Sequence, residues 1–163
     1  MKKHLMTRFN SPEWRSADKD SIYVVFEMLG FKKVADVMQL RVFDLLNLNR
    51  INNNRAEEML LCIYRFLYPN KKLDDGIYYD EIDQYFSYRE WKKTHKQLDQ
   101  VTVSDILLTD GINQVALLRI FDGVTSAFYK SSEYNSRKYR YNNLYELLKH
   151  RSGVRKEGDN GKA

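Results

Sequence analysis

The sequence predicts an all-α protein. Only 7 glycines and 2 prolines occur among the 163 residues, whereas sandwiches and barrels need many tight turns that use these residues. Apolar residues recur at helical spacing in several segments. The hydrophobic fraction of 43% and the charged fraction of 30% are typical of a globular chain rather than a disordered one.

The N-terminal part is expected to contain an irregular arm and then a small helical domain. Residues 1–15 are interpreted as the arm, and residues 16–69 as the domain. A first helix is predicted over about Ser21–Leu29, because four apolar residues fall on one helical face. These residues are Val24, Val25, Met28 and Leu29. Gly30 suits the end of this helix.

Two short helices and an asparagine-rich turn follow. The short helices are marked by Val34, Val37 and Met38, and by Val42, Leu45 and Leu46. The turn spans Asn49–Asn54, and asparagine both tolerates left-handed backbone and caps helices. Asn54 and Glu57 resemble a capping box, so a longer helix is predicted from there to about Tyr68. Pro69 then stops it.

A second helical region is expected over residues 70–151, followed by a disordered tail over residues 152–163. The predicted helices are Ile77–Leu98, Gly111–Tyr129 and Asn142–Lys149, and Lys71–Gly76 is interpreted as a linker. The segment Val101–Leu108 fits either a short helix or an extended piece. Val34–Val37 resembles Val103–Ile106, but nothing like the asparagine-rich turn is recognised after the second copy, so an internal duplication is not predicted.

A family resemblance is carried by residues between Leu29 and Met59. The matching residues are Phe31, Val34, Asp36, Val37, Leu45, Leu46, Ile51 and Glu58. In this order and without gaps they resemble the C-terminal domain of the bacterial RNA polymerase alpha subunit. The resemblance implies a helix-hairpin-helix unit over about residues 21–68, which would bind DNA in a transcription-related role.

The chain departs from that family at the residues that contact DNA. The family has a glycine and lysines in the hairpin, where this chain has Asn52, Asn53 and Asn54, with Arg55 at the place of a serine. An arginine and an asparagine near the start of the family's first helix fall near Ser21 and Val24 here. These departures favour an alternative, a protein-interaction adaptor that keeps the helix-hairpin-helix fold without binding DNA.

Two segments are candidate nucleic-acid sites. At the hairpin, a helix N-terminus attracts phosphate, and the candidate residues are Lys32, Lys33, Arg50, Asn52, Asn53, Asn54 and Arg55. Alternatively, the asparagines only make the turn and cap the helix.

The second segment is Lys130–Lys156, which contains eight Lys and Arg and only two acids, whereas the formal charges of Met1–Tyr129 sum to zero. Its cations would bind the nucleic-acid backbone, and its tyrosines would stack on bases. The candidate residues are Lys130, Arg137, Lys138, Tyr139 and Arg140. The alternatives are that the tyrosines pack on the core, or that the segment binds a protein with an acidic surface.

Little in the sequence points to catalysis. Cys62 is the only cysteine, which excludes an intrachain disulfide and a thiolate zinc site. The acidic cluster Asp74–Asp83 could hold Mg²⁺ for a metal-dependent enzyme, or could complement a helix dipole. We therefore expect no enzyme activity, no cofactor and no bound metal. Without an apolar run of about 20 residues or a signal peptide, we expect a cytoplasmic protein that does not enter the membrane and binds DNA.

Overall fold

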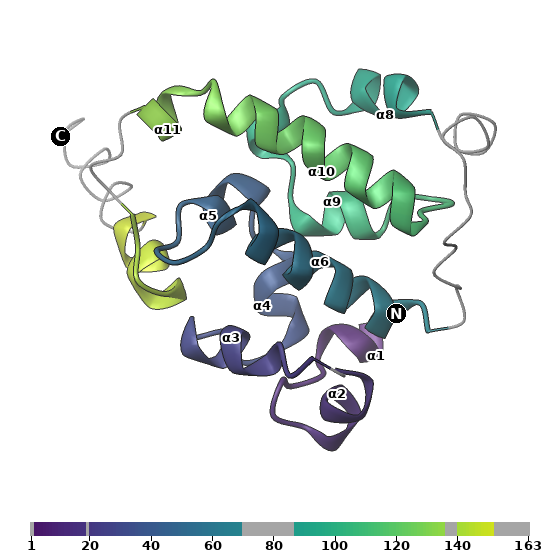
Figure 1. Ribbon diagram of the computed structural model, residues 1–163, viewed down its shortest axis with the longest axis vertical. Helices are drawn as coiled ribbons and strands as arrows, with labels where there is room; N and C mark the ends of the chain where they lie inside the picture. Colours follow the sequence, from purple (N-terminus) through teal and green to yellow (C-terminus); the bar gives the residue numbers. More distant parts are fainter. Residues whose placement is uncertain (1, 19, 70–86, 136–139, 152–163) are drawn as a thin grey trace, which may run out of the picture.

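The computed structural model describes residues 2–18, 20–69, 87–135 and 140–151 (Figure 1). In these ranges the backbone forms helices, turns and isolated bridges, with no longer strand. The prediction of a mainly helical chain is therefore confirmed. The predicted linker, residues 77–86 of the predicted helix Ile77–Leu98 and the predicted tail lie outside the described residues. In the described part, that helix ends at Thr94 rather than at Leu98.

The N-terminal residues do not form the expected irregular arm. They contain α1 (Lys2–Leu5) and α2 (Pro12–Ala17), and the Ser11 side chain caps α2 by accepting the Trp14 N–H. Phe9 and Trp14 are completely buried. The Phe9 ring stacks on Phe26 with 4.1 Å between centroids, and the Trp14 ring lies 4.9 Å from Phe66. The prediction was wrong because these aromatic partners are distant in sequence, where local periodicity gives no signal.

Asp18 connects this N-terminal part to α3 (Tyr23–Met28). Its buried carboxylate accepts the Trp14 indole N–H at 2.9 Å and the backbone N–H groups of Ile22 and Tyr23 at 2.9 and 2.6 Å. α3 buries Ile22, Phe26 and Leu29, a spacing of i, i+4 and i+7. The predicted apolar face was therefore partly wrong, since Val24 and Met28 are 51% and 56% exposed.

Three helices follow, α4 (Val34–Met38), α5 (Val42–Leu46) and α6 (Asn53–Leu67). Asp36 in α4 accepts the Lys33 N–H at 3.0 Å, and Asp44 in α5 accepts the Arg41 N–H at 2.9 Å. Each aspartate thus satisfies a free donor at the start of its helix. α6 is capped by Asn52, whose Oδ1 accepts the Arg55 N–H at 2.8 Å, so the cap lies two residues before the predicted Asn54.

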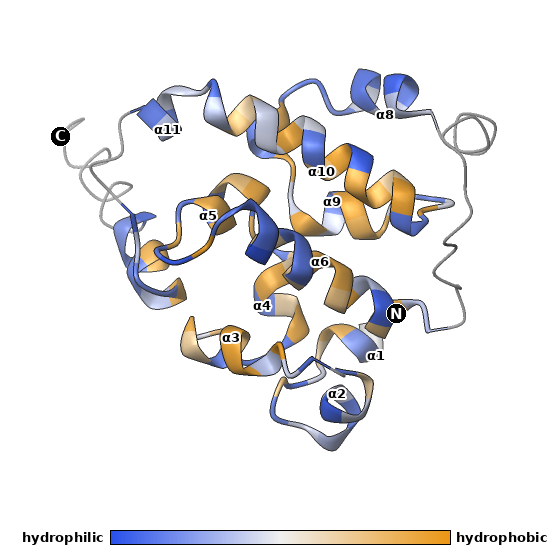
Figure 2. Ribbon diagram, in the orientation of Figure 1, coloured by the Kyte–Doolittle hydropathy of each residue, from blue (hydrophilic) through white to orange (hydrophobic). Residues whose placement is uncertain are grey.

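The second half begins with α8 (Tyr88–Thr94), the 3₁₀-helix η1 (Leu98–Gln100) and α9 (Val103–Leu107). The long helix α10 (Gln114–Tyr129), the short α11 (Ser132–Asn135) and a helix over residues 144–151 complete it. The segment that sequence left open is therefore the short helix α9. Figure 2 shows that α10 is apolar along much of its length, whereas α8 is polar.

The structure contains an internal duplication that the sequence did not predict. Residues 40–67 (the first unit) and residues 101–128 (the second unit) each form a short helix, a loop and a long helix. The units match without gaps at a spacing of 61 residues, so that Arg41 matches Thr102. The identical pairs are Val42/Val103, Asp44/Asp105, Leu46/Leu107, Ile51/Ile112 and Asn52/Asn113.

Backbone geometry and burial follow the same register in both units. Arg50 and Gly111 occupy matching places and have φ angles of 70° and 71°. Asn52 caps α6, and Asn113 caps α10 by accepting the Ala116 N–H at 2.7 Å. Matching positions of α6 and α10 are buried along their whole length: Ala56/Leu117, Met59/Ile120, Leu60/Phe121, Ile63/Val124, Tyr64/Thr125 and Leu67/Phe128. Of the four asparagines in the first turn, only Asn52 has an asparagine counterpart, Asn113, so the composition of the second turn does not show the likeness.

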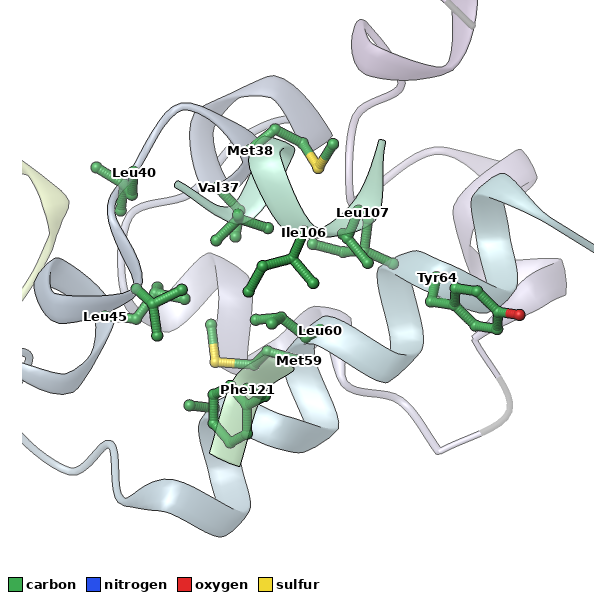
Figure 3. Packing of buried hydrophobic residues seen from close by; sticks show 14 of the residues in the cluster. Val37, Met38, Leu40, Leu45, Met59, Leu60, Tyr64, Ile106, Leu107 and Phe121 are labelled. Atoms are coloured by element: carbon green, nitrogen blue, oxygen red, sulfur yellow. The ribbon is translucent and has the colours of Figure 1, made fainter. Parts of the chain in front are cut away.

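The two units meet through reciprocal backbone hydrogen bonds. The Val42 N–H donates to the Val101 oxygen, and the Val103 N–H donates to the Leu40 oxygen, both at 2.9 Å. This pairing has approximate twofold symmetry, because each bond is the counterpart of the other. Figure 3 shows side chains from α4, α6 and α9 meeting around Ile106, so the units share their apolar contacts.

Buried residues from Phe9 to Leu147 belong to one hydrophobic cluster. The expected domains over residues 16–69 and 70–151 therefore share a core in the part of the chain that the structure describes. α8 joins this core through Trp91, whose indole N–H donates to the Thr109 hydroxyl at 3.1 Å. The Tyr88 hydroxyl fills the space beside Gly123, where a Cβ atom would lie only 2.0 Å from it.

Cys62 on α6 provides a test of this packing. Burial raises the pKa of its thiol from 9.0 to about 12, and the charge of Asp18 acts in the same direction. We expect Cys62 to react with a disulfide reagent at pH 8 on the order of a hundredfold more slowly in the folded than in the unfolded protein. Absorbance-monitored kinetics with and without denaturant measure this ratio, and equal rates would contradict the burial.

The same shift predicts a dependence of stability on pH. The unfolded thiol loses its proton near pH 9, while the folded thiol retains it until about pH 12. The folded state therefore binds more protons in this interval, and the Cys62 contribution to stability is lost as pH rises through it. In urea titrations, the stability of Cys62→Ala should fall less steeply above pH 9 than that of the wild type, and parallel profiles would contradict the shift.

Candidate nucleic-acid interface

The hairpin between α5 and α6 is held by buried apolar residues and exposes polar ones. Leu48 and Ile51 are 0% and 3% exposed and anchor its two sides. Arg50 between them has a left-handed backbone and is exposed. Asn52 and Asn54 are exposed as well. The asparagine-rich turn therefore makes a cap, as one alternative predicted, and also leaves polar side chains on the surface.

The C-terminal segment lies directly against this hairpin. The Asn49 N–H donates to the Tyr141 oxygen at 2.7 Å, and the Tyr141 N–H donates to the Asn47 oxygen at 3.0 Å. The Asn49 side chain also donates to Asn142 at 2.6 Å. The guanidinium of Arg140 donates to the Ile51 oxygen at 3.3 Å. Two candidate segments that are about 90 residues apart in sequence therefore meet in space.

The end of α10 joins the same surface. The Tyr129 hydroxyl donates to Asn53 Oδ1 at 2.8 Å, and the neighbouring Lys130 is exposed. We use the name hairpin surface for the residues gathered here: Arg50, Asn52, Asn53, Asn54, Arg55, Tyr129, Lys130 and Arg140. A single ligand could therefore contact side chains from both candidate segments.

Other predicted site residues are placed elsewhere or are not described. The backbone of Lys32 and Lys33 pairs with the N-terminal part, since the Phe9 N–H donates to the Lys32 oxygen and Lys33 forms a bridge with Arg8. No contact that the structure describes joins these two lysines to the hairpin. Arg137, Lys138 and Tyr139 lie outside the described residues.

Carboxylates at the edge of the hairpin surface oppose its positive charge. Arg55 forms an ion pair with Glu58 at 3.0 Å, and both side chains are about half exposed. Burial raises the pKa of Glu57, and the charges of Asp122 and Glu58 raise it further. Among the described residues, Arg50, Lys130 and Arg140 form no ion pair with a carboxylate, in contrast to Arg55.

A partly buried ion cluster, centred on the buried Asp44, connects the hairpin to α11 and to residues 144–151. Arg41 donates to Asp44 at 3.0 Å and to Glu133 at 2.9 Å. Arg151 donates to the other oxygen of Asp44. Asn47, from the hairpin, donates to Glu133 at 3.3 Å. The cluster fastens α11 and residues 144–151 to α5, beside a cavity of about 270 Å³.

The charges in this cluster are balanced. Burial opposes the charge on Arg41, but hydrogen bonds to Glu133 and Asp44 outweigh it, so the pKa of Arg41 is raised. The Asp44 side chain is only 2% exposed, so removing its charge would leave two guanidinium groups without their shared partner. We infer that the cluster positions the hairpin surface rather than contacting a ligand.

Other residues that could suggest chemistry are dispersed. His4 contacts Phe66, His95 stacks on Trp91, and His150 contacts Tyr141. Among the described residues, no group of three or more His, Cys, Asp or Glu is placed to hold a metal ion. The acidic cluster Asp74–Asp83 lies outside them.

Sequence reasoning missed the residues that join the hairpin to the C-terminal segment. Asn49 and Tyr141 act through backbone groups, which carry no residue-specific signal. Arg41 and Asp44 are three residues apart, a spacing common on helices, and nothing local indicates their distant partners Glu133 and Arg151.

Comparisons with protein-family models, with curated proteins and with solved structures found no match to this chain. None of the helices in the described ranges combines the length and the apolar character needed to cross a membrane. Functional inference therefore rests on the hairpin surface itself.

The ion cluster gives a prediction with an internal control. Asp44→Asn should lower the free energy of unfolding by about 2 kcal/mol, because Arg151 loses its carboxylate partner and Arg41 keeps only Glu133. Asp36→Asn should cost about 1 kcal/mol, since Asp36 only accepts backbone N–H groups at the start of α4. Urea denaturation followed by circular dichroism measures both variants. Equal losses would show that the ion pairs add nothing to the cap.

Proposed function

We propose that the hairpin surface binds nucleic acid, with duplex DNA as its principal ligand. The supporting observation is the convergence of the two candidate segments, one carrying Arg50 and the other carrying Lys130 and Arg140. A cationic residue whose backbone is already held by hydrogen bonds loses little further conformational entropy when it contacts a phosphate. A guanidinium has five donors, so Arg140 can hold the Ile51 oxygen and still reach a phosphate.

The form of the first unit supports the relation to helix-hairpin-helix domains. A short helix, a hairpin with one left-handed residue and the capped N-terminus of a long helix follow in order. Backbone amides and the dipole at the N-terminus of α6 favour an anion there. A role in transcription rests on the family resemblance alone.

The backbone of Arg50 adds a second argument. A residue with a Cβ atom costs about 1–2 kcal/mol in the left-handed region, and the matching place in the second unit is occupied by Gly111. An exposed arginine at such a position contributes little to packing. A contact between its side chain and a phosphate would account for an arginine at this strained position.

A protein-interaction adaptor is the second candidate function. Glu57 and Glu58 weaken the positive field at one edge of the hairpin surface. Elsewhere Val24, Met28 and Tyr145 are 51%, 56% and 70% exposed. α3 and residues 144–151 are adjacent, because the Leu144 N–H donates to the Leu29 oxygen at 2.8 Å. Exposed apolar residues on neighbouring helices are typical of protein contacts.

Binding to DNA can be tested with paired arginine variants. Arg50→Ala combined with Arg140→Ala should weaken binding of a labelled duplex about tenfold and reduce the salt slope by about 1 for each phosphate that is no longer neutralised. Arg65→Ala, which removes an exposed arginine at the other end of α6, should change affinity less than twofold. Fluorescence anisotropy across a salt series measures both. Unchanged affinity in the double variant would remove the hairpin surface from the proposal.

The variant Arg50→Gly separates the effect of backbone strain at this position on stability from the effect of the arginine side chain on DNA binding. The glycine should raise the free energy of unfolding by about 0.5 kcal/mol, because relief of the left-handed strain exceeds the added entropy of the unfolded chain. The same variant should weaken DNA binding. Gly111→Ala is the matched control and should lower stability by about 1 kcal/mol, since its new Cβ meets no atom within 4 Å and only the backbone is strained. A loss of stability in Arg50→Gly would mean that the arginine is structural.

A further inference from the structure

A second cationic site lies on α8 and the loop that follows it. α10 separates α8 from α6 (Figure 1), so this site is distinct from the hairpin surface. Residues 88–97 contain four cations, Arg89, Lys92, Lys93 and Lys96, against the single acid Glu90. The charge balance of the sequence gives no sign of this stretch, because the chain up to Tyr129 is neutral as a whole.

Two of these cations, Lys93 and Lys96, border a cavity of about 490 Å³ between α8, η1 and α9. Its lining includes Lys93, Thr94, His95, Lys96, Gln97 and Asp105. The ammonium groups of Lys93 and Lys96 and the Gln97 amide thus line one space. Such a donor set is suited to phosphate oxygens, which accept several hydrogen bonds at once.

The wall of the cavity is held in place by aromatic packing. The His95 ring stacks on Trp91 with 4.1 Å between centroids and an angle of 10° between planes. His95 Nδ1 lies 3.0 Å from the Trp91 oxygen and 2.9 Å from the Thr94 hydroxyl. Trp91 in turn is buried and bonded to Thr109. A ligand would therefore meet a preorganised wall rather than a mobile loop.

The acids near the cavity reduce its positive charge without outnumbering the lysines, because Lys93 and Lys96 share the lining with one carboxylate, that of Asp105. Asp105 uses one carboxylate oxygen to accept the Thr102 N–H at 2.9 Å. Asp99 accepts the Gln100 amide at 2.9 Å. Glu90 pairs with Lys93, but the two side chains are 68% and 62% exposed, so a phosphate can displace this carboxylate at little cost. Lys96 forms no ion pair with any residue that the structure describes.

We propose that this cavity is a binding site for phosphate groups, supplied either by a free polyphosphate, such as a nucleotide, or by a nucleic-acid backbone. The proposal does not depend on the hairpin surface. Lys93 and Lys96 carry the charge recognition, while the Gln97 amide donates to a remaining oxygen; the Thr94 hydroxyl donates to the Trp91 oxygen at 2.8 Å and so belongs to the wall. The volume of about 490 Å³ admits several phosphate groups in a row.

Isothermal titration calorimetry with tripolyphosphate and with a single-stranded oligothymidine tests the site at low salt. Lys93→Ala combined with Lys96→Ala should weaken tripolyphosphate binding about tenfold or more. Lys92→Ala is the matched control, because Lys92 is an exposed lysine of the same helix outside the cavity, and it should change affinity less than twofold. Glu90→Gln should strengthen binding, since it removes the competing carboxylate.

The two ligands distinguish the sources of phosphate. Weaker binding of both in the double lysine variant assigns the site to a nucleic-acid backbone, and weaker binding of tripolyphosphate alone assigns it to a free polyphosphate. Arg50→Ala should leave tripolyphosphate affinity unchanged. A result that removes the hairpin surface from the proposed function would therefore not count against the phosphate site on α8. The proposal is overturned if the wild type binds neither ligand, or if Lys92→Ala weakens binding as much as the double variant does.

Discussion

The reciprocal pairing between Leu40–Val42 and Val101–Val103 is the contact on which the rest of the structure depends. Its two backbone hydrogen bonds fix the register of the two units, and the apolar faces of α6 and α10 then bury matching positions in one core. Short helices of five residues are not stable alone. α5 and α9 persist because each begins beside its counterpart and carries an aspartate that satisfies its first backbone donor.

The pairing of the two units also determines where the polar groups around Arg41 lie. The first unit differs from the second by having Arg41 where the second has Thr102, and Arg41 bonds to both Asp44 and Glu133. Through these bonds and the Asn47 contact, the C-terminal residues are held against the hairpin. The two units therefore share one backbone arrangement. The hairpin surface forms on the first unit only, because Arg41 in the first unit is replaced by Thr102 in the second.

The sequence predicted the helical class, the asparagine-rich turn and most helix positions, because these depend on spacing and capping within a few residues. It misplaced the cap of α6 by two residues, since each of three consecutive asparagines could fill that role. It missed the duplication because Val103–Ile106 was compared with Val34–Val37 instead of Val42–Leu45, which has the same valine and aspartate spacing. The contacts of Arg140 and Tyr129 with the hairpin depend on tertiary packing and leave no local signal.

The central claim is that the hairpin and the C-terminal segment form one nucleic-acid-binding surface. Amide chemical shifts recorded during titration with a short DNA duplex test it most directly. We expect that amides near Arg50–Arg55 and near Tyr129, Lys130 and Arg140 shift together and give one dissociation constant. Shifts confined to one segment, or distinct constants for the two, would show that they do not act as one surface, and unchanged shifts in both would contradict nucleic-acid binding there.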